Sequence, residues 1–441
     1  MEILIKVAQF LLSFSLLVIV HEFGHFLFAK IFGVRVERFQ LFFGKAWVSF
    51  TKGETVYAIG WVPFGGFVKL SGMIDESMDV EQMKQEPQPW EFRTKPAWQR
   101  MLIMVGGVLM NVVLAFVIYV GMSWAWGEQY ISNKDMVYGY AFSDFAEELG
   151  FKDGDKVLTI ADNEVEDYSK ILSSIAIESD NRVVEVERNG EVVTLQLPVV
   201  PIQNYTEDAE FVMPRYPFVI QEVVAGFGAA EAGLMPGDSL VSFNGEGALF
   251  FDEYTEKFAA NAGKSVELGV VRDSAGVDLL KTIQVAVSQE GKIGAMVSAG
   301  DYIKLRSKSY TFWESIPVGV KRVGTEMSDY WKQLKMVVQP ETEAYKSLGG
   351  PIAIGSVFPS EWNWMVLWRL TAMLSVVLAI MNILPIPAFD GGHVLFLLIE
   401  VITRRKPSDK VLIYAQSVGL ALMLFLMLYV TWNDIVRVFL H

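Results

Sequence analysis

Four long apolar runs dominate the pattern of hydrophobic and polar residues along the chain. They cover roughly residues 3–29, 101–126, 362–386 and 411–432. A transmembrane helix needs about 20 consecutive apolar residues, and each run reaches that length. The pattern therefore predicts a polytopic α-helical membrane protein with four transmembrane helices, joined by more polar segments that form elements of their own.

A secretory signal peptide is the alternative interpretation of the first run. The only basic residue ahead of its apolar stretch is Lys6, and no cleavage site of small residues follows. The run ends instead in the motif H-E-F-G-H at residues 21–25. A transmembrane helix is therefore the stronger prediction.

Shorter strand-like stretches follow the first run. Val36–Phe43, Val56–Ile59 and Trp61–Leu70 are rich in β-branched and aromatic residues, and glycines and Pro63 interrupt them. They predict either a cytoplasmic hairpin or a β-sheet that enters the membrane with an edge strand free to pair with an extended polypeptide. Residues 71–100 are polar, contain three prolines and are predicted to be a cytoplasmic loop.

The segment between the second and third runs contains an internal repeat. Gly150–Asp155 (GFKDGD) aligns with Gly233–Asp238 (GLMPGD) at an offset of 83 residues. A strand-like stretch and a hairpin signal follow in each copy: Val157–Ile160 and Arg188–Gly190 in the first, Leu240–Phe243 and Arg272–Gly276 in the second. The repeat predicts two small α/β modules in tandem, with a polar linker at roughly 201–215.

The second copy of the repeat resembles a PDZ domain in its pattern G-L-x-x-G-D-x-[LIV]. The first copy is looser, with Phe151 in the Leu position and Ala161-Asp162 where the second copy has Asn244-Gly245. PDZ domains receive an extended peptide by strand addition beside a short loop. Peptide binding and a purely steric role both remain open for these two modules.

A helical pattern of apolar residues extends from Phe312 to Val338, with Lys and Arg interspersed. It predicts either an interfacial helix on the outer leaflet or a helix packed on the two modules.

The whole chain is thus divided into a first span (1–30), a membrane-associated β-region and cytoplasmic loop (31–100), a second span (101–126), two PDZ-like modules (127–214 and 215–300), an amphipathic helical region (301–361), a third span (362–390), a cytoplasmic loop (391–410) and a fourth span (411–437).

Charge adds an orientation to this division. The formal net charge is −14, and residues 127–361 hold 20 Lys and Arg against 37 Asp and Glu, a net −17. Ten Lys and Arg lie from Lys30 to Arg100, and four more lie between the last two spans. Short loops rich in Lys and Arg stay in the cytoplasm, so both termini and the acidic region are predicted to face outward. The acidic balance excludes a nucleic-acid partner, which needs a basic face.

The chemistry concentrates at the end of the first run. His21 and His25 are four residues apart and share one face of a helix, where two imidazoles can hold one zinc ion. Glu22 beside the first histidine is placed to act as general base. Ionisable residues at membrane depth are costly and usually functional. The chain has no cysteine, so a zinc site must use His and carboxylate ligands.

The third ligand is expected after the third run. Pro385 and Pro387 break that helix at membrane depth, which is tolerated where backbone lines a cavity. Asp390 follows at the depth predicted for the histidine pair and would leave a fourth tetrahedral position for water, as in catalytic zinc sites. His393 is the competing ligand, and Asp390 is preferred because two imidazoles are already present and a buried Asp needs a partner.

The second run contains Gly106, Gly107 and Asn111. Small residues allow two helices to approach closely, and a buried amide adds a hydrogen bond between them. Packing alone explains this pattern as well as direct contact with the active site does.

Taken together, these motifs resemble the site-2 proteases, a family of intramembrane zinc metalloproteases. H-E-F-G-H ends the first span, N-x-x-P-x-P-x-x-D-G begins at Asn382, and a PDZ-like pair lies between the second and third spans. Further matches are P-F-G-G-F-V-K from Pro63, Gly107–Asn111 and Gly349-Gly350-Pro351. The sequence departs from the family at Phe389, where Leu is usual before the metal-binding Asp, and at Phe42, where Gly is usual.

The resemblance implies a zinc ion held by His21, His25 and Asp390, with Glu22 as catalytic base. It further implies substrate-binding roles for residues in the β-region and around the third span: Gly65, Gly66, Phe67, Val68, Asn111, Asn382, Pro385 and Pro387. The implied reaction is regulated intramembrane proteolysis in the bacterial inner membrane, with the active site near the cytoplasmic side and the PDZ-like modules in the periplasm.

The implied substrates are single-span membrane proteins of the anti-sigma-factor type, and in addition signal-peptide remnants, first trimmed on the outer side by an upstream site-1 protease. The PDZ-like pair would act as a size filter. A non-enzymatic scaffold that binds envelope peptides is the alternative, but a structural zinc would need no adjacent Glu22. A zinc transporter would need ionisable residues in several spans, and the second and fourth have essentially none within their cores.

Overall fold

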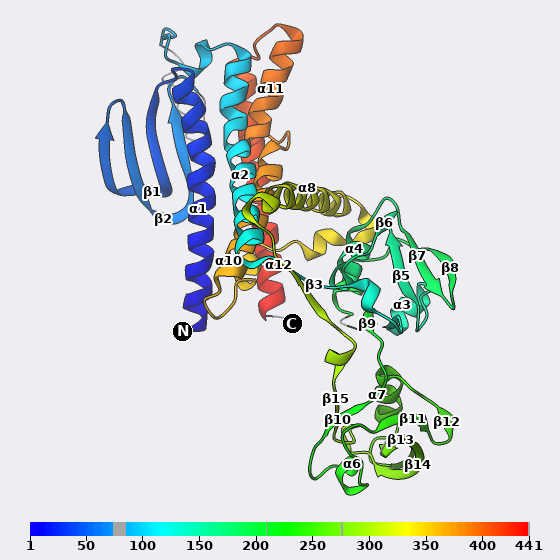
Figure 1. Ribbon diagram of the computed structural model, residues 1–441. Coiled ribbons are helices and arrows are strands. Elements are labelled where there is room, and N and C mark those ends of the chain that lie inside the picture. The colour runs from blue at the N-terminus through cyan, green and yellow to red at the C-terminus, as the bar shows by residue number, and fades with distance from the viewer. Residues whose placement is uncertain (74–84, 209, 275–276, 440–441) are drawn as a thin grey trace. The chain divides into compact units, whose positions relative to one another are not determined.

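The computed structural model describes residues 1–73, 85–208, 210–274 and 277–439 (Figure 1). The chain divides into two compact units. The membrane unit comprises Met1–Glu128, Lys308–Val338 and Tyr345–His441, and the repeat unit comprises Gln129–Ser307 and Gln339–Ala344.

Four helices of the described chain are long and apolar enough to cross a membrane, as the four apolar runs predict. They are α1 (Glu2–Ile31), α2 (Ala97–Trp126), α10 (Trp364–Ile383) and α12 (Asp409–Phe439). Helix α2 packs against both α1 and α10 in the middle of the unit. A bundle of this kind satisfies every backbone hydrogen bond within each helix, which is what a bilayer requires.

Helix α11 (Asp390–Thr403) corrects the prediction of a loop over 391–410. Pro385 and Pro387 lie between α10 and α11, and Gly391 and Gly392 lie in the first turn of α11. The residues after His393 nevertheless form an apolar stretch, VLFLLIEVI, which only Glu400 interrupts. This stretch forms a helix that packs against α2 and α10. Its position is secured by a buried ion pair between Arg100 of α2 and Glu400, with a nitrogen–oxygen distance of 2.6 Å.

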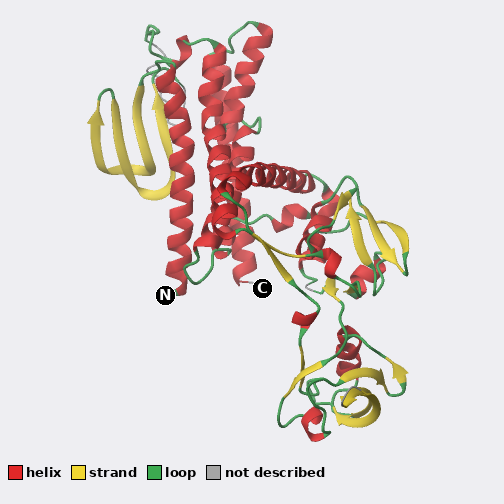
Figure 2. Ribbon diagram, in the orientation of Figure 1, coloured by secondary structure: helices red, strands yellow, loops and turns green. Residues whose placement is uncertain are grey.

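Strands β1 (Val36–Lys52) and β2 (Thr55–Leu70) form one sheet beside α1 (Figure 2). Both strands fold back on themselves, because Arg38–Leu41 has partners on two sides, Gly66–Lys69 and Val56–Ile59. Residues 46–52 pair with 55–60, so the rows run 46–52, 55–60, 36–43 and 62–70. The predicted strands are therefore present, and the row 62–70 is an edge of the sheet.

The sheet contacts α1 within the apolar length of that helix. A Cβ on Gly66 would lie 2.8 Å from Val18 and 3.6 Å from Glu22, and the ring of Phe39 contacts that of Phe26. All three partner residues belong to the candidate span Glu2–Ile31. This placement favours the sheet that enters the membrane over a hairpin lying wholly in the cytoplasm.

Two further helices of the membrane unit are α8 (Phe312–Val337) and α9 (Pro351–Ser356). The buried face of α8 packs on α2 and α10, where Gly319 lies against Val120 and Val323 joins an apolar cluster with Ile380. Trp313 and Trp331 of α8 stay at least half exposed, as an interfacial helix requires.

The Gly349-Gly350-Pro351 motif leads into α9, and α12 holds it in place. The buried carboxylate of Asp434 accepts hydrogen bonds from the backbone N–H groups of Gly350, Ile352 and Ala353 at 2.9 to 3.1 Å. These are the orphan donors at the start of a helix, which a carboxylate satisfies well.

The repeat unit contains two modules of the same construction. The first consists of β4 (Tyr140–Phe142), α3 (Asp144–Glu148), β5 (Lys156–Ile160), β6 (Asn163–Glu164), α4 (Ile171–Ile177), β7 (Val183–Arg188), β8 (Glu191–Gln196), α5 (Gln203–Thr206) and β9 (Val212–Pro214). The second consists of β10 (Ile220–Val223), α6 (Gly228–Glu231), β11 (Ser239–Phe243), β12 (Glu246–Gly247), α7 (Phe251–Ala260), β13 (Ser265–Ser274), β14 (Val277–Ala286) and β15 (Ala295–Val297). Strands β3 (Glu128–Ile131) and β16 (Leu305–Lys308) flank the pair.

The repeat detected in the sequence is a repeat of topology. Each module has a four-stranded sheet, with orders β6-β5-β7-β8 and β12-β11-β13-β14, and a separate strand pair, β4–β9 or β10–β15. Each also has its own apolar core. The Asn189-Gly190 turn predicted between β7 and β8 is present, whereas residues 275–276 of the second hairpin lie outside the described residues.

The linker predicted at 201–215 is in fact part of the first module. Helix α5 and strand β9 lie within it, and β9 pairs with β4. Tyr205 and Phe211 are fully buried in the core of that module. The surrounding polar residues hid these two aromatic side chains from an argument based on average composition.

Candidate active site

Helix α1 places His21 and His25 one turn apart, with their Nε2 atoms 3.2 Å from one another. Asp390, the first residue of α11, brings its Oδ2 atom to 3.2 Å from Nε2 of His21 and 3.3 Å from Nε2 of His25. These three side chains form a group that can hold a metal ion, the one such group among the residues that the structure describes. Residues 365 positions apart in the chain therefore meet at one point.

The geometry of this group fits zinc. Zinc binds imidazole nitrogen and carboxylate oxygen at about 2.0–2.1 Å, so ligand atoms at the corners of a tetrahedron lie about 3.3–3.4 Å apart. The three distances here are 3.2, 3.2 and 3.3 Å. Oδ2 of Asp390 is also a buried polar atom without a hydrogen-bond partner. Three acceptors that converge on one point, one of them an unpaired carboxylate oxygen, need a cation, and a fourth corner stays open for water.

A backbone group of α2 orients His25. Its Nδ1 lies 2.9 Å from the carbonyl oxygen of Ile103, and a carbonyl can only accept, so Nδ1 carries the proton. Nε2 is then left with a free lone pair towards His21 and Asp390. Metal-binding histidines are regularly fixed in this way by a hydrogen bond at their second nitrogen.

Glycines allow α2 to approach the two imidazoles. A Cβ on Gly107 would lie 2.5 Å from Nε2 of His25 and 2.7 Å from Cε1 of His21. A Cβ on Gly106 would lie 2.8 Å from the carbonyl oxygen of Gly24 in α1. Any larger residue at these crossing points would force the helices apart and pull α2 away from the histidines.

The break between α10 and α11 positions Asp390. Gly391 and Gly392 let the preceding loop fold back onto the first turn of α11, because a Cβ on Gly392 would lie 2.6 Å from the carbonyl oxygen of Ile386. Ala388 completes the turn with a φ of 90°. A non-glycine residue at positive φ is strained, which is a common feature of active-site loops.

Glu22 lies between the metal group and the sheet. Its carboxylate is within electrostatic reach of both histidines and of Asp390, and it accepts a hydrogen bond from the backbone N–H of Val68. Gly66 lies against its Cγ atom, with a Cβ built there only 3.6 Å away. The edge row 62–70 therefore runs directly past the predicted base.

The other predicted substrate-binding residues spread around this centre. Gly65 has a φ of 71° and packs against the ring of Phe43, which stacks on Phe67 at 6.5 Å between centroids. Asn382 is half-buried in the last turn of α10, and Pro385 is exposed in the loop after it. Their contact with a substrate stays a prediction.

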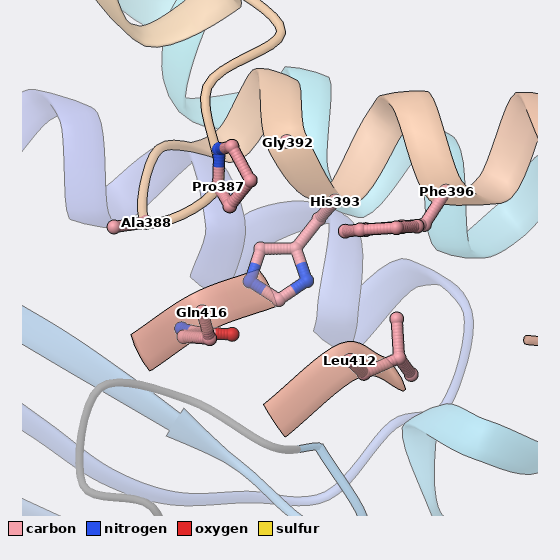
Figure 3. A pocket seen from close by; sticks show the side chains of 7 residues that line it. All are labelled: Pro387, Ala388, Gly392, His393, Phe396, Leu412 and Gln416. Atoms are coloured by element: carbon pink, nitrogen blue, oxygen red, sulfur yellow. The ribbon is translucent and has the colours of Figure 1, made fainter. Parts of the chain in front are cut away.

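His393 lies away from the metal group. Its ring lines a small cavity between α11 and α12, together with Pro387, Phe396, Leu412 and Gln416 (Figure 3). Pro387 thus faces α12, and a Cβ on Gly419 of that helix would collide with its carbonyl oxygen. Among the described residues His393 is not part of the group that can hold a metal, which disfavours it as the alternative third ligand.

The sequence analysis missed two residues of the site. Ile103 acts through its backbone carbonyl, and no side-chain pattern signals such a role. Gly24, within H-E-F-G-H, is the counterpart of Gly106 at the helix crossing. Its position on the same helix as the histidines was the available signal, because small residues at such spacing mark close contacts.

Comparison with known proteins covers nearly the entire chain. The model of the family described as Peptidase family M50 matches residues 9–426. The regulator of sigma E protease of Haemophilus influenzae is 28% identical over 99% of this chain and 100% of its own length. Protease RseP of Yersinia pestis is also 28% identical, over 99% and 100%. A Xylella fastidiosa protein whose name describes a zinc metalloprotease is 27% identical over 96% and 97%.

Proposed function

Because the chain belongs to peptidase family M50, the site-2 proteases, we propose that its catalytic centre consists of His21, His25 and Asp390 as zinc ligands and Glu22 as general base. The protein is an intramembrane zinc metalloprotease of the kind that carries out regulated intramembrane proteolysis. The observation that supports this assignment most directly is the meeting of three acceptor atoms at the spacing of a tetrahedral zinc site.

Zinc at this site supplies a Lewis acid that lowers the pKa of a bound water towards about 7 and polarises a carbonyl group. Glu22 would take a proton from the attacking water and pass it to the leaving amine. The backbone N–H of Val68, in the edge row of the sheet, donates a hydrogen bond to this carboxylate and fixes its direction. Ile103 and Gly107 hold the imidazoles in the matching orientation.

The substrate is an extended segment of a single-span membrane protein. A helix hides its carbonyls in hydrogen bonds, so it must unwind before it is cut. The edge row 62–70 passes Glu22 and offers backbone groups for strand addition. Gly65, Gly66, Phe67 and Val68 then hold the unwound segment, and Asn382 and Pro385 are proposed as further contacts.

The names of the relatives indicate the class of substrate. The relative from Haemophilus influenzae is described as a regulator of sigma E protease. Membrane-bound anti-sigma factors are therefore the proposed substrates, with signal-peptide remnants as a second group and an upstream site-1 protease that trims them first. The two PDZ-like modules act as a size filter that excludes substrates with large outer domains. Their acidic surface belongs to the periplasm, and the metal centre lies near the cytoplasmic face of the inner membrane.

A cleavage assay on a tagged, pre-trimmed single-span substrate tests the proposal, with zinc content measured in the same preparations. Glu22→Gln is expected to lower the rate by about 10²–10⁴-fold while keeping zinc, because only the base is lost. Asp390→Ala is expected to lose both zinc and activity. His393→Ala is the matched control and is expected to keep its zinc. Undiminished cleavage by Glu22→Gln would refute the mechanism.

A separate experiment addresses the size filter. Substrates with outer domains of increasing mass are compared in the full-length protein and in a variant that lacks residues 127–300. The proposal predicts that the intact protein rejects large domains and that the shortened variant cuts them. Equal rejection by both would overturn the filter without affecting the metal site.

A further inference from the structure

Asn111 lies on the face of α2 that meets the metal group. Its side chain is fully buried, and its amide lies 3.3 Å from Nδ1 of His21. Its backbone carbonyl accepts a hydrogen bond of 2.8 Å from the hydroxyl of Ser375 in α10. Asn111 therefore stands between the helix that carries the histidines and the helix that leads to Asp390.

The spacing along α2 links Asn111 to the two residues that already serve the site. Ile103, Gly107 and Asn111 follow one another at intervals of four and share one face of the helix. Ile103 accepts from His25, and Gly107 leaves room for both rings. All three residues of this face of α2 therefore contact the histidine pair or leave room for it. Asn111 is the one that lies opposite His21.

The protonation of His21 decides how Asn111 acts. Nε2 of His21 faces Asp390 and His25 and must be free of a proton to bind a metal. The proton then lies on Nδ1, which needs an acceptor. The amide nitrogen stands at 3.3 Å in that position, and a nitrogen donor cannot accept.

The amide oxygen of Asn111 is at the same time a buried atom without a hydrogen-bond partner. The oxygen and nitrogen of an amide are assigned from their hydrogen bonds, so the two ends are interchangeable by a half turn. That half turn brings Oδ1 opposite the Nδ1–H of His21. It removes a contact between two donors and gives the orphaned oxygen a partner, while the NH2 group moves to the site that the oxygen leaves.

We propose that Asn111 is a positioning residue for the metal centre, which accepts a hydrogen bond from Nδ1–H of His21 through its Oδ1 atom. It holds His21 in the tautomer with a free Nε2, as the carbonyl of Ile103 does for His25. This inference rests on the proposed zinc site of His21, His25 and Asp390. It assigns Asn111 to the support of a ligand instead of to substrate contact.

Nitrogen-15 NMR of the full-length, zinc-loaded wild type gives the first test, and four histidines keep its spectrum simple. His21 is expected to show a protonated Nδ1 and a metal-bound Nε2, with the signal assigned from the spectrum of His21→Gln. Zinc bound to Nδ1 of His21 would overturn the proposal. This measurement needs no variant at position 111, so it does not depend on the folding of one.

Zinc affinity, measured by competition with a chelator, gives the second test. Asn111→Leu keeps the branched side chain and removes the acceptor, and a lost outer partner of this kind lowers metal affinity about 10–100-fold. Asn111→Asp keeps an acceptor and is expected to bind zinc at least as tightly as the wild type. Ser375→Ala, which removes only the bond to the backbone of Asn111, is the packing control and is expected to match the wild type.

The outcomes separate this inference from the zinc site itself. Wild-type affinity in Asn111→Leu, or an equal loss in Asn111→Asp and Asn111→Leu, would overturn the role of Asn111 and leave the zinc site standing. Unchanged zinc binding in His25→Ala would instead refute the proposed zinc site.

Discussion

The two modules of the repeat unit share their topology and the ion pair that closes each of them. In the first, Arg188 makes two hydrogen bonds of 2.7 Å to the carboxylate of Asp155 and one of 2.8 Å to the carbonyl of Gly150. In the second, Arg272 does the same with Asp238 at 2.6 Å and with the carbonyl of the equivalent glycine at 2.9 Å. Both carboxylates are buried. We call this arrangement of arginine, aspartate and glycine carbonyl the clamp, and it is common to both modules.

The modules differ at the strand edge where a peptide would add. Val212 of β9 and Ala295 of β15 are 83 residues apart and occupy equivalent positions in their strand pairs. In the first module the hydroxyl of Tyr168 donates a hydrogen bond of 3.0 Å to the carbonyl of Val212. The residue equivalent to Tyr168 is Phe251, which has no hydroxyl, and no side chain of the described residues bonds the carbonyl of Ala295.

This difference shows that the fold and the access to its edge vary independently. The clamp lies inside each module and is present in both, whereas the hydroxyl of Tyr168 bonds a carbonyl of the outer edge in the first module alone. A size filter requires only the first property. Peptide binding also requires a strand edge that is open to the peptide. At this position only the second module has such an edge.

The largest effect is expected from breaking the clamp. Asp238→Ala leaves Arg272 without its buried partner, and Asp155→Ala does the same to Arg188, so local unfolding of each module should become easier by about 3 kcal/mol. Hydrogen exchange of the full-length protein, followed by mass spectrometry, reports each module separately. Glu164→Ala, which removes an exposed ion pair with Lys134, is the control and should change exchange by less than about 0.5 kcal/mol. If all three variants changed the free energy of local unfolding by similarly small amounts, the clamp would not stabilise the modules.

A smaller effect is expected from acid. Burial alone would raise the pKa of Asp238, but the hydrogen bonds from Arg272 and from the backbone of Met235 hold it below its usual range. Because the folded-state pKa is lowered, the stabilisation is complete above the unfolded pKa of about 3.9 and is lost as the pH falls through the folded value. Pepsin cleavage within residues 215–300 should therefore rise as the pH drops below about 4. Asp238→Asn should show no such step in the same assay.

A turn between equivalent strands sharpens the comparison further. Ala161 and Asp162 have φ angles of 50° and 63°, in the place of Asn244 and Gly245 with 49° and 83°. Non-glycine residues other than Asn and Asp are strained there, and Asn244 also accepts a hydrogen bond of 2.8 Å from the backbone N–H of Glu267. Replacing Ala161-Asp162 by Asn-Gly should stabilise the first module by about 1 kcal/mol, as seen by hydrogen exchange. Replacing Asn244-Gly245 by Ala-Asp should destabilise the second module. Hydrogen-exchange rates that stay at the wild-type value in both variants would contradict this account.

The smallest effect on stability is expected at the strand edge. Tyr168→Phe removes one hydrogen bond and should weaken the first module by about 1 kcal/mol or less. It should also free the carbonyl of Val212, so that the variant is expected to crosslink an extended peptide near β9, whereas the wild type is expected to do so only near β15. Phe251→Tyr is the reciprocal variant and should reduce crosslinking near β15. Crosslinking that ignores both variants would show that the hydroxyl does not control the edge.

Much of this protein follows from local patterns in its sequence. The four spans follow from apolar length, and the repeat follows from GFKDGD and GLMPGD with their hairpins. The pairing of His21 with His25 follows from a helical spacing of four. These features depend on residues within one helix or one module, where spacing alone determines which side chains are neighbours.

What only the tertiary structure decided is how separate helices meet. The glycines at 24, 106 and 107 set the crossing of α1 and α2, and that crossing brings the carbonyl of Ile103 to His25 and the amide of Asn111 to His21. The helix α11 was missed for the same reason, and the sequence did not show that His393 turns towards α12. A backbone carbonyl carries no signature in the sequence, and the direction of a side chain after a proline-broken turn depends on the helices packed around it. The metal group could be predicted from its residue types, whereas the bonds that orient it required the fold.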